Sequence, residues 1–191
     1  MPNFGDAVKA VGIQKLIAQS ISWIYVAGDK PAHEDEQLDL AAPDARGRAV
    51  NAAYTAEQAF AGIPNTVILR YGLFYGPGTW YARDSYTTDQ LRRGELMTND
   101  AVVSFLHVAD AAQAALLALD WSAGVYNIVD DEPATKKDLF SVYAKLIDAP
   151  PPPYTAGRAA WERGESNAKA RRMGWQPMYS TWREGFKVEL T

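Results

Sequence analysis

Residues 66–79, TVILRYGLFYGPGT, form the stretch that decides the fold. Its apolar and β-branched residues predict one buried strand that runs into a turn at its Gly-Pro dipeptide. Working outward, KLIAQSISWIYV (15–26) predicts a second buried strand upstream, while VVSFLHV (102–108) and GVYNIVD (124–130) predict two shorter strands downstream.

Helical spacing of apolar residues marks the segments between and around these strands. The predicted helices are NFGDAVKAVG (3–12), AVNAAYTAEQAF (49–60), a segment at about 82–94, ADAAQAALLALD (109–120), PATKKDLFSVYAKLID (133–148) with a capping pair of Thr135 and Asp138, and two short helices near the C-terminus. The segment 28–48 is acidic and contains Gly and Pro, so it predicts a loop. Strands that alternate with helices predict an α/β fold with mostly parallel pairing.

Composition excludes several classes of protein. The 191 residues are 48% hydrophobic and 12% aromatic, which is typical of a globular chain with a sizeable core. A net charge of −4 argues against a nucleic-acid binder, and the absence of cysteine excludes disulfides and thiolate chemistry. The apolar stretch 111–119 is far shorter than the ~20 residues that span a bilayer, and the first residues lack a secretory pattern. We therefore expect a cytoplasmic protein that binds neither membrane nor nucleic acid.

Four segments in order resemble one family. LRYGLFYGPGT (69–79), SFLHVADAAQAAL (104–116), GVYNIVDDEPATKKDLF (124–140) and SNAKARRMGWQP (166–177) are similar to segments of the NAD-dependent epimerase/dehydratase family, the extended short-chain dehydrogenases. The resemblance implies a partial Rossmann-like, mostly parallel sheet with flanking helices. It assigns residues 1–80 to a remnant of the dinucleotide-binding domain. It assigns 81–191 to a small C-terminal α/β lobe for a nucleotide sugar or similar substrate, with some strands returning to the sheet.

The family's phosphate-binding motif has no counterpart in this sequence. Members open with a strand and a G-x-x-G-x-x-G turn that approaches the dinucleotide pyrophosphate. The present chain is expected to start at the helix before the family's fifth strand. NAD or NADP is implied by the resemblance, but its phosphate loop is absent. The sheet edge left open predicts pairing with another chain, either a second copy in a homo-oligomer or a chain that carries the missing N-terminal half.

The family's catalytic Tyr-x-x-x-Lys pair is absent as well. If Tyr54 is the tyrosine, the lysine position holds Gln58. A better register uses the glutamate that usually follows the lysine by four, here Glu57, and this places Ala49 and Ala53 at the two positions. The family's Ser/Thr position falls on Ile21, between Ser20 and Ser22. A phenol of pKa ~10 needs a neighbouring ammonium to act as a base at neutral pH, so the redox trio is absent.

The candidate site residues follow from these motifs. The candidates for catalysis are Tyr54, Ser20, Ser22 and His107; for cofactor binding Tyr71, Gly72 and Leu73; and for substrate binding Arg70, Tyr75, Arg83 and His107. Each also has a plainer interpretation. Tyr54 is expected to pack on its helix, and His107 to orient a loop. The acidic run HEDE (33–36) is expected to be a solvated loop, so no metal site is predicted.

Three functions are compatible with this pattern. The first is an atypical member of the family that is redox-inactive alone and binds a nucleotide or sugar-like small molecule. The second is an oligomerisation or binding module that pairs its open sheet edge, or an enzyme completed by the chain that pairs with it. The third is an enzyme with a different mechanism, built from residues such as His107, Tyr25 or Tyr71. The sequence leaves all three open.

Overall fold

A three-stranded parallel sheet forms one half of the molecule. The computed structural model describes residues 4–191, so the first residue of the helix predicted at 3–12 lies outside it; the helix itself, α1, covers Phe4–Ala10. Strands β1 (Leu16–Ile21), β2 (Thr66–Tyr71) and β6 (Gly124–Ile128) pair in the order β1-β2-β6, both pairs parallel. This confirms the predicted α/β fold with a Rossmann-like parallel sheet.

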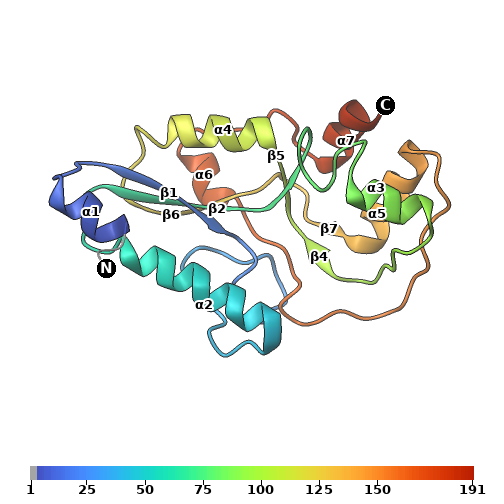
Figure 1. Cartoon of the computed structure of the whole chain (residues 1–191), viewed down its shortest axis with the longest axis horizontal. Helices are drawn as coiled ribbons and strands as arrows, with labels where there is room; N and C mark the ends of the chain where they lie inside the picture. Colours follow the sequence, from blue (N-terminus) through green and yellow to red (C-terminus); the bar gives the residue numbers. More distant parts are fainter. Residues whose placement is uncertain (1–3) are drawn as a thin grey trace.

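Helices cover both faces of this sheet. Helix α2 (Asp44–Ala59) lies on one face, and α4 (Val108–Leu117) and α6 (Ala168–Arg172) lie on the other (Figure 1). The apolar core between the sheet and the latter two helices includes Leu69, Leu106 and Trp175, all buried. Strand β2 is buried along nearly all of its length, which is why its sequence reads as an almost continuous apolar run.

The remaining elements gather around a second, aromatic core. They are β3 (Leu73–Tyr75), β4 (Val102–Val103), β5 (Phe105–His107), β7 (Ala134–Thr135), α3 (Tyr86–Arg92), α5 (Lys136–Leu146) and α7 (Trp182–Leu190). Strand β3 pairs with β5 in parallel, and β4 pairs with β7 in antiparallel fashion. The ring of Tyr75 stacks on Phe186 of α7 with centroids 4.5 Å apart, so the C-terminal helix is part of this core.

The prediction of a single strand over the opening stretch was wrong, because the chain changes sheet at Gly72. The Gly72 amide bonds to Ile128 in the first sheet, and the next amide, Leu73, bonds to Ser104 beside β5. A Cβ at Gly72 would lie 2.7 Å from the Ser104 carbonyl oxygen, so a side chain would prevent this close crossing. The predicted strand at 102–108 divides likewise, since β4 and β5 have different partners.

Two further elements begin or end at residues other than the predicted ones. Strand β1 ends at Ile21 rather than 26, and Tyr25 forms an isolated antiparallel bridge with Leu38 instead. Helix α2 begins at Asp44 inside the predicted loop, where Gly47 permits contact with the Ala42 carbonyl that a Cβ would block. Glycine and proline in this segment therefore concealed the first turn of the helix.

The cap of α5 agrees with the sequence pattern. The Thr135 hydroxyl oxygen accepts from the Asp138 amide at 3.1 Å and lies 2.7 Å from its carboxylate, which confirms the predicted pair. Helix α5 itself starts at Lys136, after the short strand β7, rather than at 133.

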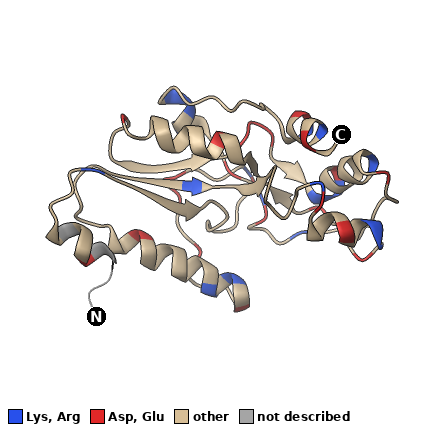
Figure 2. Ribbon diagram, turned by 45° about the horizontal axis from the view of Figure 1, so that its top comes forward, with Lys and Arg blue, Asp and Glu red and all other residues tan. Residues whose placement is uncertain are grey.

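Acidic and basic side chains are interspersed over the ribbon (Figure 2). Among the helices described, none is long and apolar enough to cross a bilayer. Within residues 4–191 no three histidine or acidic side chains gather in a way that could hold a metal ion.

Candidate functional site

A cavity lies beyond the carboxyl ends of β1 and β2, where open α/β sheets bind their ligands. Its volume is about 260 Å³, and we call it the Trp23 pocket. Aromatic rings of Trp23, Tyr81 and Trp161 line it. Trp23 follows β1 by two residues, and Leu73, also in the lining, follows β2 by two. The two strands of the parallel sheet thus place an apolar, aromatic surface at this position.

The buried carboxyl of this pocket belongs to Glu165. The Ser22 hydroxyl donates to Glu165 Oε2 at 3.1 Å, and Ser104 both hydrogen-bonds the carboxyl and accepts from the Glu165 amide at 2.9 Å. Burial raises the pKa of Glu165 to about 7, and the two hydroxyls and the charge of Arg163 only partly oppose that rise. A carboxyl of this kind changes its charge near neutral pH.

A second buried carboxylate, Glu57, lies between α2 and the sheet and has an opposite charge beside it. Arg70 on β2 forms two short bonds with Glu57, at 2.6 and 2.9 Å, and also donates to the Tyr25 hydroxyl at 2.9 Å. That hydroxyl donates to Asn127 Oδ1 at 2.6 Å, and the Ser20 hydroxyl donates to Glu57 at 2.6 Å. Burial raises the pKa of Tyr25 to about 12, so it is a neutral hydrogen-bonding group and not a base.

The position of Glu57 selects between the two registers of the family motif. Glu57 is buried against the sheet, whereas Tyr54 and Gln58 are exposed on α2. This burial favours the register in which Glu57 takes the place of the glutamate that follows the family's lysine, with Ala49 and Ala53 at the tyrosine and lysine positions. Tyr54 is 37% exposed and lines an open groove beside α2, so its ring packs only in part.

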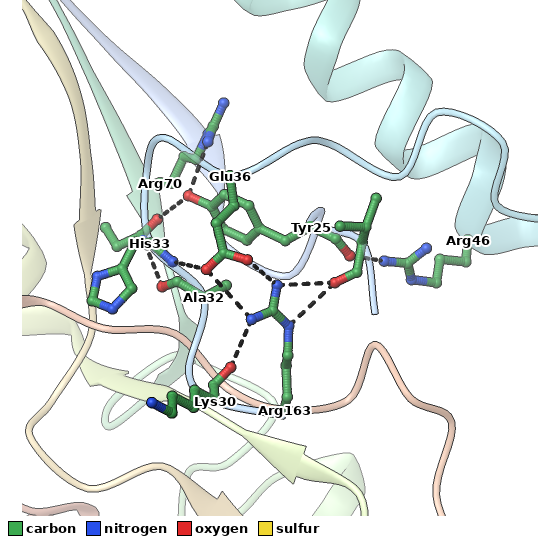
Figure 3. A network of polar contacts seen from close by, with 10 residues as sticks. Tyr25, Lys30, Ala32, His33, Glu36, Arg46, Arg70 and Arg163 are labelled. Atoms are coloured by element: carbon green, nitrogen blue, oxygen red, sulfur yellow. Dashed lines mark hydrogen bonds and ion pairs between the residues drawn. The ribbon is translucent and has the colours of Figure 1, made fainter. Parts of the chain in front are cut away.

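An arginine clamp fixes the acidic loop beside the pocket (Figure 3). Arg163 donates to Glu36 at 2.6 Å and to the carbonyl oxygens of Val26 and Lys30 at 3.0 and 2.6 Å. The hydrogen bond from Arg163 lowers the pKa of Glu36. His33 and Asp35 are exposed, as expected of a solvated loop, and Glu34 and Glu36 are partly buried.

Several predicted site residues lie elsewhere. His107 is buried as the N-cap of α4, where Nδ1 accepts from the Ala109 amide at 3.2 Å and Nε2 lies 3.1 Å from Glu189. Tyr75 is enclosed in the aromatic core. Arg83 is exposed and donates to the carbonyl oxygens of the last two residues at 2.6 and 2.9 Å. None of these side chains lines the Trp23 pocket.

Two of the predicted residues contribute to the pocket. Leu73 lines it directly, and Ser22 reaches it through Glu165. The Tyr71 hydroxyl instead donates to the Ala111 carbonyl at 3.2 Å, on the α4 side of the sheet. Leu73 gives the pocket an apolar wall, and the sequence offers no Gly-rich turn that would bind the phosphates of a dinucleotide.

The sequence analysis missed Trp23, Trp161 and Glu165. The first was taken as part of a long strand, and the other two lie in a segment with no regular structure. The clue was the run WERGE (161–165), which combines an aromatic residue, acids and an arginine beside a glycine.

Comparison with known proteins places this chain in a family. No family model matches the chain. A curated protein, the 3-diazoavenalumate denitrifying reductase of a Streptomyces species, is 36% identical over 205 residues, covering 96% of this chain and 67% of that protein. The chain belongs to the NAD-dependent epimerase/dehydratase family.

Solved structures of the family share the fold over 97% of the chain. UDP-glucose 4-epimerase of Thermus thermophilus, solved with NAD, superposes with a TM-score of 0.72 at 22% identity, over 66% of its length. WbmG of Bordetella bronchiseptica, solved with NAD and UDP, gives 0.78 at 21% identity over 62% of its length. The chain thus spans about two thirds of the length of these members of the family.

Proposed function

We propose that the chain supplies the substrate-binding part of a nicotinamide-dependent reductase, with the hydride acceptor bound in the Trp23 pocket. The 36% identical relative named as a reductase supports this assignment. So does the position of the pocket beside Leu73, at the carboxyl ends of the sheet strands. A nicotinamide bound beside the pocket would supply the hydride. The residues of this chain would bind and orient the acceptor and keep water out of the aromatic cavity.

The burial of Glu57 carries the proposal. It supports a register in which Ala49 and Ala53 replace the acid–base pair of the family, so a reaction that needs a tyrosinate is disfavoured. The reduction of a diazonium-type compound needs none. The carbon that bears the diazonium group gains the hydride, the bond from this carbon to nitrogen breaks, and the two electrons of that bond leave with N₂. The redox inactivity expected from the sequence then applies to the sugar chemistry of the family and not to this step.

The experiment uses reduced nicotinamide mononucleotide, which lacks the pyrophosphate–adenosine half that needs a Gly-rich turn. The purified chain should accelerate its oxidation by an arenediazonium salt, and W23A should lose the acceleration while W80F, at a largely exposed tryptophan, keeps it. UDP-glucose with the oxidised mononucleotide should give no turnover. Turnover of the sugar nucleotide, or no acceleration with the diazonium salt, would overturn the proposal.

A second candidate follows from the sheet edge. Within residues 4–191, β1 pairs only with β2, so its other edge carries unpaired backbone groups. We propose that this edge joins a second copy of the chain, or a chain with the Gly-rich turn that completes the cofactor site. Sedimentation should show a dimer or larger oligomer, and a stable monomer would contradict the homo-oligomer.

Calorimetric titration with NADH and NADPH separates the two candidates. Binding by the chain alone favours a complete reductase site. Absence of binding favours a cofactor-free module for a nucleotide or sugar-like ligand, completed by a partner. A cytoplasmic location stays a prediction.

A further inference from the structure

The walls of the Trp23 pocket are suited to a flat, positively charged ligand. Aromatic faces attract cations through the ring quadrupole, most strongly at tryptophan. The guanidinium of Arg46 lies 4.1 Å from the ring centroid of Trp161, whereas in the described part of the chain no cation lies over the rings of Trp23 and Tyr81.

The charges of the lining leave one carboxyl without a cation of its own. Lys136 and Glu162 lie 3.5 Å apart and offset each other. Arg163, next to Glu165 in the chain, is committed to Glu36 and to backbone carbonyls. Among residues 4–191 no lysine or arginine forms an ion pair with Glu165, which is held by hydroxyl groups alone.

We propose that the Trp23 pocket binds an aromatic ligand carrying a positively charged nitrogen group, and that Glu165 is the carboxylate that receives this charge. The inference rests on the proposed reductase function and specifies its substrate class, because a diazonium group is such a cation. A buried carboxylate attracts a cationic group and also orients the ligand, because the charged end of the ligand then lies at the carboxylate.

The proposal has a pH signature. Burial holds the pKa of Glu165 at about 7, and a bound cation favours the ionised form. Affinity for a permanent cation should therefore rise about tenfold from pH 6 to pH 8, in step with the ionised fraction of this carboxyl. The other groups around it are Arg163, Lys136, Glu162 and Tyr81. Burial raises the pKa of Tyr81 to about 12, well above this range.

The test compares two soluble probes of matched shape, 4-(trimethylammonio)phenol and the neutral 4-tert-butylphenol, in calorimetric titrations of the full chain. The cation should bind more tightly than the neutral probe and show the tenfold gain, whereas the neutral probe should show none. E165Q should remove the gain and weaken cation binding. The matched control E162Q, at a carboxyl already offset by Lys136, should keep the gain.

Two results would overturn the proposal: equal affinity for both probes at both pH values, or a pH gain that survives in E165Q. If E165Q fails to fold, S22A decides instead: loss of the hydroxyl that donates to Glu165 Oε2 at 3.1 Å should raise the pKa of that carboxyl further and move the gain to higher pH, and a gain at unchanged pH would overturn the proposal. The outcome is separable from the reductase function. Oxidation of reduced nicotinamide mononucleotide without a preference for the cation would sink this inference alone, and cation binding without hydride transfer would sink the reductase alone.

Discussion

Two buried glutamates near the carboxyl end of the parallel sheet differ in what lies beside the carboxyl group. Glu57 is held by the guanidinium of Arg70 at 2.6 Å, and both side chains are almost fully enclosed. Glu165 is equally enclosed but is held by the hydroxyls of Ser22 and Ser104. A carboxylate with a fixed counter-charge, as at Glu57, serves to hold α2 against the sheet. A carboxyl without one stays able to change its charge, which is a property of binding and reacting sites.

The largest expected effect comes from breaking the settled pair. R70M leaves the Glu57 carboxylate buried and uncompensated, which should cost about 3–5 kcal/mol in the free energy of unfolding. Urea denaturation measures this loss. R92M, which removes an exposed partner 4.0 Å from Asp89, should change stability by less than about 1 kcal/mol. If R70M is as stable as the R92M control, then the pair does not hold α2 to the sheet.

The unpaired carboxyl should show itself in the pH dependence of stability. Its pKa is raised by burial from 4.5 to about 7, so the folded state keeps a proton that the unfolded chain releases between these values. Stability should therefore fall as pH rises from about 4.5 to 7, by on the order of 3 kcal/mol for this group. E165Q cannot release the proton and should lack this component.

Asp130 makes the variant comparison necessary. Burial raises the pKa of this carboxyl as well, to about 8, so the wild-type slope contains both groups. The difference between the wild-type and E165Q curves, measured by urea denaturation from pH 5 to pH 8, isolates Glu165. Parallel curves would mean that Glu165 is already ionised in the folded protein, and the contrast with Glu57 would disappear.

The elements of the fold and the residues of the pocket differ in how far the sequence could predict them. The parallel sheet followed from apolar runs such as 66–71, because a strand buried on both faces leaves a clear local pattern. The capping pair of Thr135 and Asp138 was equally local. The register based on Glu57 could also be proposed from the sequence, because it depends only on the spacing of residues along one helix.

The pocket was not predictable in the same way. It joins residues 23, 73, 104 and 165, which come together only when β2 passes into β3 at Gly72 and the segment before α6 crosses the strand ends. His107 and Arg83 show the converse error, because a charged or aromatic motif residue carries no local sign of whether it faces a cavity or caps a helix. His107 caps α4, and Arg83 holds the last carbonyls of the chain.

The smallest expected effects compare two tyrosines that the sequence analysis names as candidates for different chemistry, Tyr25 and Tyr54. Y25F removes a hydroxyl that donates to Asn127 at 2.6 Å and accepts from Arg70 at 2.9 Å. It should therefore destabilise the protein by about 1–3 kcal/mol.

Y54F removes a hydroxyl from an exposed side chain and should change stability by no more than about 0.5 kcal/mol. It should also leave the oxidation of reduced nicotinamide mononucleotide unchanged, because Tyr54 lies beside α2 and not in the Trp23 pocket. A loss of turnover in Y54F with unchanged stability would restore Tyr54 as the catalytic tyrosine. It would also reverse the assignment of Ala49 and Ala53 to the family's tyrosine and lysine positions.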